Sequence, residues 1–216
     1  MTLTVGILLY DGVELLDFAG PYEVFTVASR VRLREESGAE PPFEVFTVGA
    51  KPEVVVTHAG LRVLPDVTFG AHRPVDVLVV PGGVVDGALA DPGVGDWVAR
   101  TSSRARLTAS VCTGAFLLAR AGLLDGRPAT THWEDVDDLQ ARYPRVRAVR
   151  DCRWVDDGDV VTAAGISAGI DMALHLVVRF GGRELALRTA EYMQYEWEGE
   201  PPTSAEAPRT PPRPAS

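Results

Sequence analysis

The sequence of 216 residues is long enough for one α/β domain with a single sizeable core, and 46% hydrophobic and 24% charged residues are ordinary for a globular protein. A formal net charge of −9 and the absence of a Lys/Arg cluster argue against a nucleic-acid-binding groove. Two cysteines are too few for a disulfide framework, and the opening run TLTVGILLY is too short to span a bilayer. We therefore expect a cytoplasmic protein with neither a membrane nor a nucleic acid as partner.

Short Val/Ile/Leu runs alternate with longer helical patterns, which predicts an α/β fold with a doubly wound, mostly parallel sheet and helices on both faces. In the first half of the chain, the predicted elements are a strand at Leu3–Leu9, a helix at Pro21–Ser29, a strand at Phe43–Val48, a hairpin over 54–66 that turns at Ala59-Gly60, and a strand at Val75–Val80. Pro21 is expected to open its helix, where a missing N–H costs nothing. The polar segment RVRLREESGAEPP, residues 30–42, is expected to be a mobile loop.

The second half continues the alternation of strands and helices. Its predicted elements are a helix around Val94–Arg100, a strand at Arg106–Ser110, a helix at Thr113–Ala121 capped by Gly122, a strand at Pro128–Thr131, a helix at Glu134–Tyr143, a hairpin through Asp157-Gly158 that returns as a strand at Val160–Ala163, and closing helices at Ser167–Phe180 and Glu184–Met193. From Gly199 the sequence is Pro-rich with almost no large apolar residues. We therefore predict a single domain over 1–198 and a disordered tail over 199–216.

Unusual residues follow the predicted strands at the point where each strand ends. They are Asp17 in LLDFAGP, Gly82 and Gly83 in PGG, Cys112 and Thr113 in VCTG, His132 and Trp133 in THW, and Ile166 and Ser167 in AGISAGID. Ligands of open parallel sheets bind beyond the carboxyl ends of the strands, so these residues are expected to share one site. The histidines show no metal-ligand spacing, and no metal ion is expected.

Cys112 lies between a predicted strand and a predicted helix and has mostly small neighbours, which is the setting of a nucleophile elbow. The helix N-terminus is expected to lower the pKa of the thiol and to supply N–H groups that bind an oxyanion. The alternative is that Cys112 is only a small buried hydrophobic residue. Its position at the strand–helix junction favours the nucleophile.

Asp17 is either a helix cap or a carboxyl partner of Cys112, with a pKa raised by partial desolvation, and the local sequence does not decide between these. The Gly82-Gly83 pair forms either a tight turn or a bare backbone that donates to an oxyanion, and we favour the second.

A lone His after a strand, such as His132, is more often a hydrogen-bonded core residue than a catalytic one. Trp133 is expected to pack in the core or to form a pocket wall. Cys152 is interpreted as an incidental strand residue that does not pair with Cys112.

Four segments, LLDFAGPYEVF, VPGGVVDGALAD, SVCTGAFLLARAGLLDGRPATTHW and AAGISAGIDMALHLV, resemble the ThiJ/PfpI superfamily and, within it, the isocyanide (isonitrile) hydratase branch. The resemblance runs from about Val5 to Tyr195 and implies a flavodoxin-like fold. It also implies Cys112 as nucleophile, Asp17 as its acidic partner, flanking N–H groups at Gly83 and Thr113, and a homodimer with the elbow near the interface. Many protease-like and deglycase-like relatives carry His directly after the cysteine or Glu as the acidic partner. Thr113 and Asp17 depart from those branches and agree with the hydratase.

The implied reaction is hydration of an isocyanide to an N-substituted formamide, through a thioimidate on Cys112 with Asp17 as general acid and base. No cofactor is required. The pocket is expected to include Gly82, His132, Trp133, Ile166 and Ser167.

Two alternatives to this hydratase stay open. One is a non-enzymatic redox or ligand sensor, because the same domain forms the sensor half of certain AraC-type regulators, although a regulator would continue into a helix-turn-helix region where this sequence has the Pro-rich segment. The other is a cysteine-dependent enzyme that acts on reactive carbonyls or glycated amines.

Overall fold

A seven-stranded sheet in the order β10-β11-β7-β6-β1-β2-β5 forms the centre of the computed structural model, which describes residues 1–197 and 199. Its strands are β1 (Leu3–Leu9), β2 (Phe43–Gly49), β5 (Val67–Thr68), β6 (Val77–Val80), β7 (Leu107–Val111), β10 (Trp154–Asp156) and β11 (Val160–Ala163). Every pairing in this sheet is parallel except that between β10 and β11. The run β2-β1-β6-β7-β11 has the flavodoxin-like order 2-1-3-4-5, which confirms the predicted fold class.

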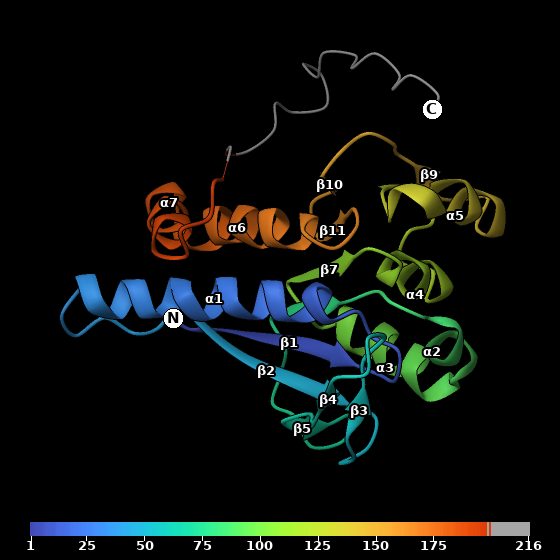
Figure 1. Cartoon of the computed structure of the whole chain (residues 1–216), viewed down its shortest axis with the longest axis horizontal. Coiled ribbons are helices and arrows are strands. Elements are labelled where there is room, and N and C mark those ends of the chain that lie inside the picture. The colour runs from blue at the N-terminus through green and yellow to red at the C-terminus, as the bar shows by residue number, and fades with distance from the viewer. Residues whose placement is uncertain (198, 200–216) are drawn as a thin grey trace.

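Helices cover the sheet on both faces. They are α1 (Leu15–Glu35), α2 (Asp86–Ala90), α3 (Pro92–Ser102), α4 (Gly114–Arg120), a 3-10 turn η1 (Trp133–Asp135), α5 (Val136–Arg142), α6 (Ala168–Gly181) and α7 (Arg183–Tyr192). Helices α1, α6 and α7 pack against one another, and α2, α3 and α4 form a second contacting group (Figure 1). Because both faces are covered, the central strands β6 and β7 are buried along their whole length.

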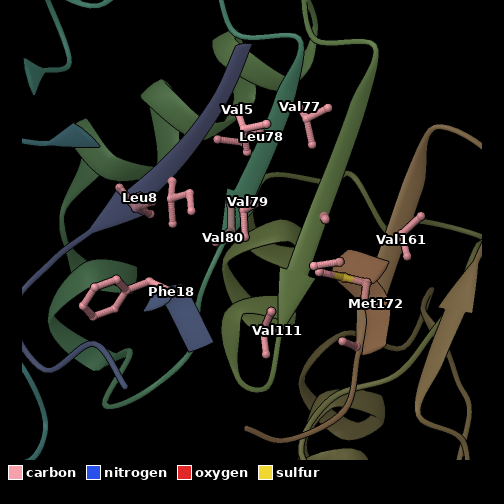
Figure 2. Packing of buried hydrophobic residues seen from close by; sticks show 14 of the residues in the cluster. Val5, Leu8, Phe18, Val77, Leu78, Val79, Val80, Val111, Val161 and Met172 are labelled. Carbon is pink, nitrogen blue, oxygen red and sulfur yellow. The ribbon is translucent and has the colours of Figure 1, made fainter. Parts of the chain in front are cut away.

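The buried side chains of neighbouring strands meet in register. Val5 of β1 lies opposite Val77 of β6, and Figure 2 shows Met172 of α6 farther along the sheet, near Val161 of β11. A Cβ on Gly169 would lie 2.9 Å from Val111 Cγ1, so α6 approaches the end of β7 more closely than a larger residue would permit. This close approach places the N-terminus of α6 beside the residue that follows β7.

The first helix starts earlier than predicted. Glu14 is its N-cap, with a side-chain oxygen that accepts a hydrogen bond from the Leu15 N–H at 3.2 Å. Pro21 therefore lies inside the helix, and the prediction that it opens the helix is wrong. Because proline has no N–H, the Asp17 carbonyl lacks its usual intrahelical donor one turn later.

The same helix also ends later than predicted. The segment predicted as a mobile loop is helical as far as Glu35, because its charged residues form a solvated helix face rather than a break in the pattern. Arg32 pairs with Glu36 at 2.7 Å across one turn, while Val31 on the other face is buried.

The remaining differences lie at the edges of the fold. Pro128–Ala129 (β8) pairs in parallel with Arg147–Ala148 (β9) in a separate two-stranded sheet, so the strand predicted at 128–131 is shorter and outside the main sheet. The predicted hairpin is present as β3 (Val55–Val56) and β4 (Arg62–Val63), and helix α2 was not predicted. The predicted tail lies outside the described residues, apart from Gly199. None of the described helices is long and apolar enough to cross a membrane.

Candidate active site

Cys112 is the residue at which the chain turns from β7 into α4. Its φ of +56° is in the left-handed region, which a residue with a side chain rarely adopts, and this strained turn is the predicted elbow. The turn is held on several sides: the Cys112 N–H donates to the Ala164 carbonyl at 3.0 Å, and the Thr131 hydroxyl donates to the Cys112 carbonyl at 2.8 Å. A Cβ on Gly114 would lie 2.1 Å from the Val80 carbonyl oxygen, so only glycine fits where α4 begins.

The thiol of Cys112 is not acidic in this site, which corrects the expectation of a lowered pKa. The residue is only 7% exposed, and burial followed by the negative charge of Asp17 raises the pKa of the thiol to about 12. The Thr113 N–H, the Ile166 N–H and the Thr113 hydroxyl oppose this rise, but they do not offset it. The group at rest is therefore a thiol, and a base must remove its proton when it reacts.

Asp17 lies in the first turn of α1 and is fully buried. Its Oδ2 accepts a hydrogen bond from the Gly82 N–H at 3.0 Å, so the side chain is directed at the loop after β6 rather than at its own helix N-terminus. The pKa of Asp17 is raised to about 7, mainly by burial. The Gly82 N–H lowers this pKa, and the charge of Glu14 raises it. Of the two interpretations of Asp17, the geometry favours the carboxyl partner over the helix cap.

The contact between the two side chains is loose in this structure. The Cys112 thiol acts on the pKa of the Asp17 carboxyl as a weak donor, whereas within the described part of the chain Oδ1 has no partner with hydrogen-bonding geometry. A buried carboxyl oxygen without a partner is costly, so its presence points to a role in exchanging a proton or holding a small ligand.

The Gly82-Gly83 loop connects the segments after β1, β6 and β7. The Gly83 N–H donates to the Thr113 Oγ1 at 2.9 Å, and the Thr113 hydroxyl lies at the same distance from the Gly83 carbonyl. The predicted donor at Gly83 is therefore occupied, and an oxyanion would have to displace the Thr113 hydroxyl from it. The N–H groups of Thr113 and Ile166 are the ones directed at the sulfur.

Sequence reasoning missed two titratable residues of the site. Tyr10 is buried at the end of β1 and donates to the Pro81 carbonyl at 2.9 Å; burial and then the charges of Asp17 and Cys112 raise its pKa well above its usual value. Glu14 lies one helical turn before Asp17 and has no motif of its own. The position of Tyr10 directly after the first strand was the one available signal, because the other functional segments also follow strands.

The second group of predicted residues lies on the other side of Cys112. His132 packs its ring against Gly165, where a Cβ would be 2.3 Å from the His132 Cδ2, and its Nδ1 lies 3.4 Å from an Asp135 carboxylate oxygen. Together with Trp133, Ile166 and Ser167 it lines a cavity of about 600 Å³. No contact in the described residues joins His132 to the thiol of Cys112.

Cys152 also lines this cavity; it lies in a loop rather than in a strand, and both cysteines are free. Across residues 1–197 and 199, no three His, Cys, Asp or Glu side chains are grouped so that they would hold a metal ion.

Comparison with known proteins shows the family of the chain. A profile of the DJ-1/PfpI family matches residues 3–179. The isonitrile hydratase of Pseudomonas putida is 36% identical over 215 residues, which is 98% of this chain and 86% of that protein. The HTH-type transcriptional regulator GbdR of Pseudomonas aeruginosa is 34% identical over 194 residues, or 89% of this chain but 51% of the regulator.

Among solved structures, a THiJ/PfpI family protein from Pseudomonas syringae superposes with a TM-score of 0.78 at 30% identity, covering 96% of this chain and 80% of that one. The range matched by the family profile includes Asp17, Gly82 and Cys112. The chain belongs to the DJ-1/PfpI family.

Proposed function

We propose that the protein is a cysteine-dependent hydratase that adds water to an isocyanide and releases an N-substituted formamide. The observation that carries this proposal is the buried Asp17 carboxyl, with a pKa of about 7 and one oxygen without a partner, beside a thiol whose pKa is raised to about 12. Between these two pKa values the pair holds one proton, on the thiol, and one negative charge, on the carboxylate. The proton moves from sulfur to Asp17 only when an electrophile arrives.

The first half of the reaction adds the thiol to the terminal carbon of R–N≡C. The Cys112 sulfur forms a bond to that carbon while Asp17, as carboxylate, accepts the thiol proton. The protonated Asp17 then delivers this proton to the same carbon, which gives the thioimidate Cys112–S–CH=N–R. A thiol that is 7% exposed suits this substrate, because a linear isocyanide presents its reactive carbon at a slender end.

The second half adds water to the thioimidate carbon. Asp17 accepts a proton from the water and passes it to the nitrogen, which gives the tetrahedral adduct Cys112–S–CH(OH)–NH–R. The carbon–sulfur bond then breaks, the hydroxyl proton returns to sulfur by way of Asp17, and the formamide leaves. The N–H groups of Thr113 and Ile166, which face the sulfur, stabilise the charge that develops there.

A sensor or ligand-binding role is the second candidate, and it rests on the regulators of Pseudomonas aeruginosa that match 85–89% of this chain but only about half of their own length. Redox sensing by Cys112 is weakened by its raised pKa, because peroxide oxidises the thiolate and not the thiol. Action on reactive carbonyls uses the same nucleophile, so only assays separate it from hydration.

The test is a side-by-side assay of the purified protein with cyclohexyl isocyanide and with methylglyoxal, following the formamide and lactate by chromatography. We expect formamide to form and Cys112→Ala to lose at least about 10³-fold in rate, as a covalent mechanism requires. Cys152→Ser is the matched control and is expected to lose far less than Cys112→Ala, because it leaves the nucleophile in place. Consumption of methylglyoxal alone, or an active Cys112→Ala, would contradict the proposal.

The homodimer expected from the family resemblance is likewise a proposal. Light scattering of the full chain tests it, and a mass close to that of one 23.2 kDa chain would overturn it.

A further inference from the structure

A cavity next to the elbow offers a place for the part of the substrate that the thiol does not touch; Cys112 does not line it, but Ile166, whose N–H faces the sulfur, does. It lies between the segments 130–136, 150–153 and 164–168, and its volume is about 600 Å³. Its inner wall is tied to the nucleophile at three points: the Ile166 N–H faces the sulfur, the Ala164 carbonyl accepts from the Cys112 N–H, and the Thr131 hydroxyl donates to the Cys112 carbonyl.

Two large apolar side chains of this cavity are left uncovered by the described residues. Trp133 is 72% exposed and Ile166 is 41% exposed, although most large apolar residues of the protein are buried. The Trp133 ring is tilted against the ring of His132, with the two centroids 5.8 Å apart, and the two rings together form one wall of the cavity. An indole held beside a cavity and open to solvent is suited to contact an aromatic ring.

The charges around the cavity argue against a negatively charged substituent. Arg153 binds Asp171, with an Nε–Oδ2 distance of 2.7 Å, and Arg150 is paired with Asp137. Both guanidinium groups are therefore already neutralised, and Asp151 adds a carboxylate to the lining. A carboxylate on the substrate would gain little from these cations and would lose its strong hydration, whereas burial of an uncharged ring is favourable.

We propose that this cavity holds the N-substituent of the isocyanide and that Trp133 makes the site selective for aromatic substituents. The inference rests on the proposed function and extends it to the substrate class. When the sulfur attacks the terminal carbon, the substituent is on the far side of the nitrogen and must leave the elbow through a neighbouring space. The thioimidate then stays anchored at both ends while water adds to its carbon.

The test compares kcat/KM for phenyl isocyanide and methyl isocyanide in the wild type, Trp133→Ala and Trp133→Phe. We expect Trp133→Ala to lose about tenfold or more with phenyl isocyanide and to change less than about twofold with methyl isocyanide, because the small substrate does not reach the indole. Trp133→Phe should recover most of the loss. Tyr192→Ala, which removes another half-exposed aromatic ring from α7, is the control and should change neither value.

Equal effects of Trp133→Ala on the two substrates would overturn the inference and leave hydration intact. Calorimetry with the products, N-phenylformamide and N-methylformamide, separates failure of the hydratase proposal from failure of the cavity proposal. If the protein hydrates no isocyanide but binds only the phenyl product, and loses this binding in Trp133→Ala, the hydratase proposal is refuted and the cavity proposal is not. Failure to prefer the phenyl product would refute the cavity. Light scattering completes the test, because a change of mass in Trp133→Ala would assign the indole to a subunit contact and contradict the proposal.

Discussion

The two sides of Cys112 differ in how tightly the chain fills them. On one side, Asp17 is fully buried, the N–H groups of Gly82 and Gly83 are both occupied, and a Cβ on Gly82 would lie 2.6 Å from the Thr113 nitrogen. On the other side, Trp133 and Ile166 border a cavity and remain exposed. The closed side fixes a proton donor and acceptor in a desolvated place, as proton transfer requires, and the open side leaves surface for recognition.

Asp17→Asn breaks the closed side most severely. The amide keeps an oxygen that can accept from the Gly82 N–H, but it cannot carry a proton, so we expect kcat/KM to fall by at least about 10²-fold. An isocyanide assay measures this loss. A variant with the wild-type rate would remove Asp17 from the proton pathway.

The same substitution is expected to stabilise the fold. Since the folded protein holds the Asp17 proton up to a pKa of about 7, against 3.8 for a free carboxyl, stability falls as pH rises between these values. Above pH 7 the buried charge costs at most about 4.5 kcal/mol, at about 1.4 kcal/mol for each pKa unit between 3.8 and about 7. Urea unfolding should show a larger gain for Asp17→Asn at pH 8 than at pH 5, and a gain independent of pH would contradict the raised pKa.

Gly114→Ala tests the elbow without touching a titratable group. The new Cβ would lie 2.1 Å from the Val80 carbonyl oxygen, so β6 or α4 must shift, and we expect a loss of about 3 kcal/mol in unfolding free energy. Gly87→Ala in α2, where nothing lies within 4 Å of the added Cβ, is the control and should be neutral or slightly stabilising. Equal unfolding free energies for the two variants would show that the elbow is not tightly packed.

The pH dependence of kcat/KM tests the electrostatics of the closed side. The productive pair needs the Asp17 carboxylate and the Cys112 thiol together, so the rate should rise with pH through the Asp17 pKa of about 7 and then level off. Glu14→Gln removes a charge that raises this pKa, and the rising limb should move to lower pH. A limb that does not move would mean that Glu14 is too well solvated to act on Asp17.

His132→Asn is expected to have the smallest effect, because the ring packs against Gly165 and not against the thiol. A direct general acid or base contributes about 10²–10⁴ in rate, so we expect a loss below about tenfold in the isocyanide assay. A greater loss would indicate that His132 takes part in catalysis.

The sequence was sufficient for the architecture because buried parallel strands appear as continuous apolar runs, as in β1, β6 and β7. It also placed Cys112 and Asp17 at one edge of the sheet, since residues after parallel strands gather there. It could not give the extent of α1, because a Pro inside a helix and a charged helix face resemble a helix start and a loop.

The thiol pKa was predicted in the wrong direction for a related reason. The helix N-terminus is visible in the sequence, but burial and the charge of Asp17 arise only when distant segments pack together, and they outweigh it. The contributions of Tyr10 and Glu14 depend on the same packing, and only the position of Tyr10 directly after the first strand was a signal for either of them.

The proposed mechanism requires covalent attachment of the substrate to Cys112. Mixing excess protein with phenyl isocyanide, quenching rapidly with acid and mapping peptide masses measures this attachment directly. We expect the peptide containing Cys112 to gain the full mass of the isocyanide before formamide accumulates, and Cys112→Ala to form neither species. Formamide production by Cys112→Ala, or an adduct confined to the peptide containing Cys152, would contradict it.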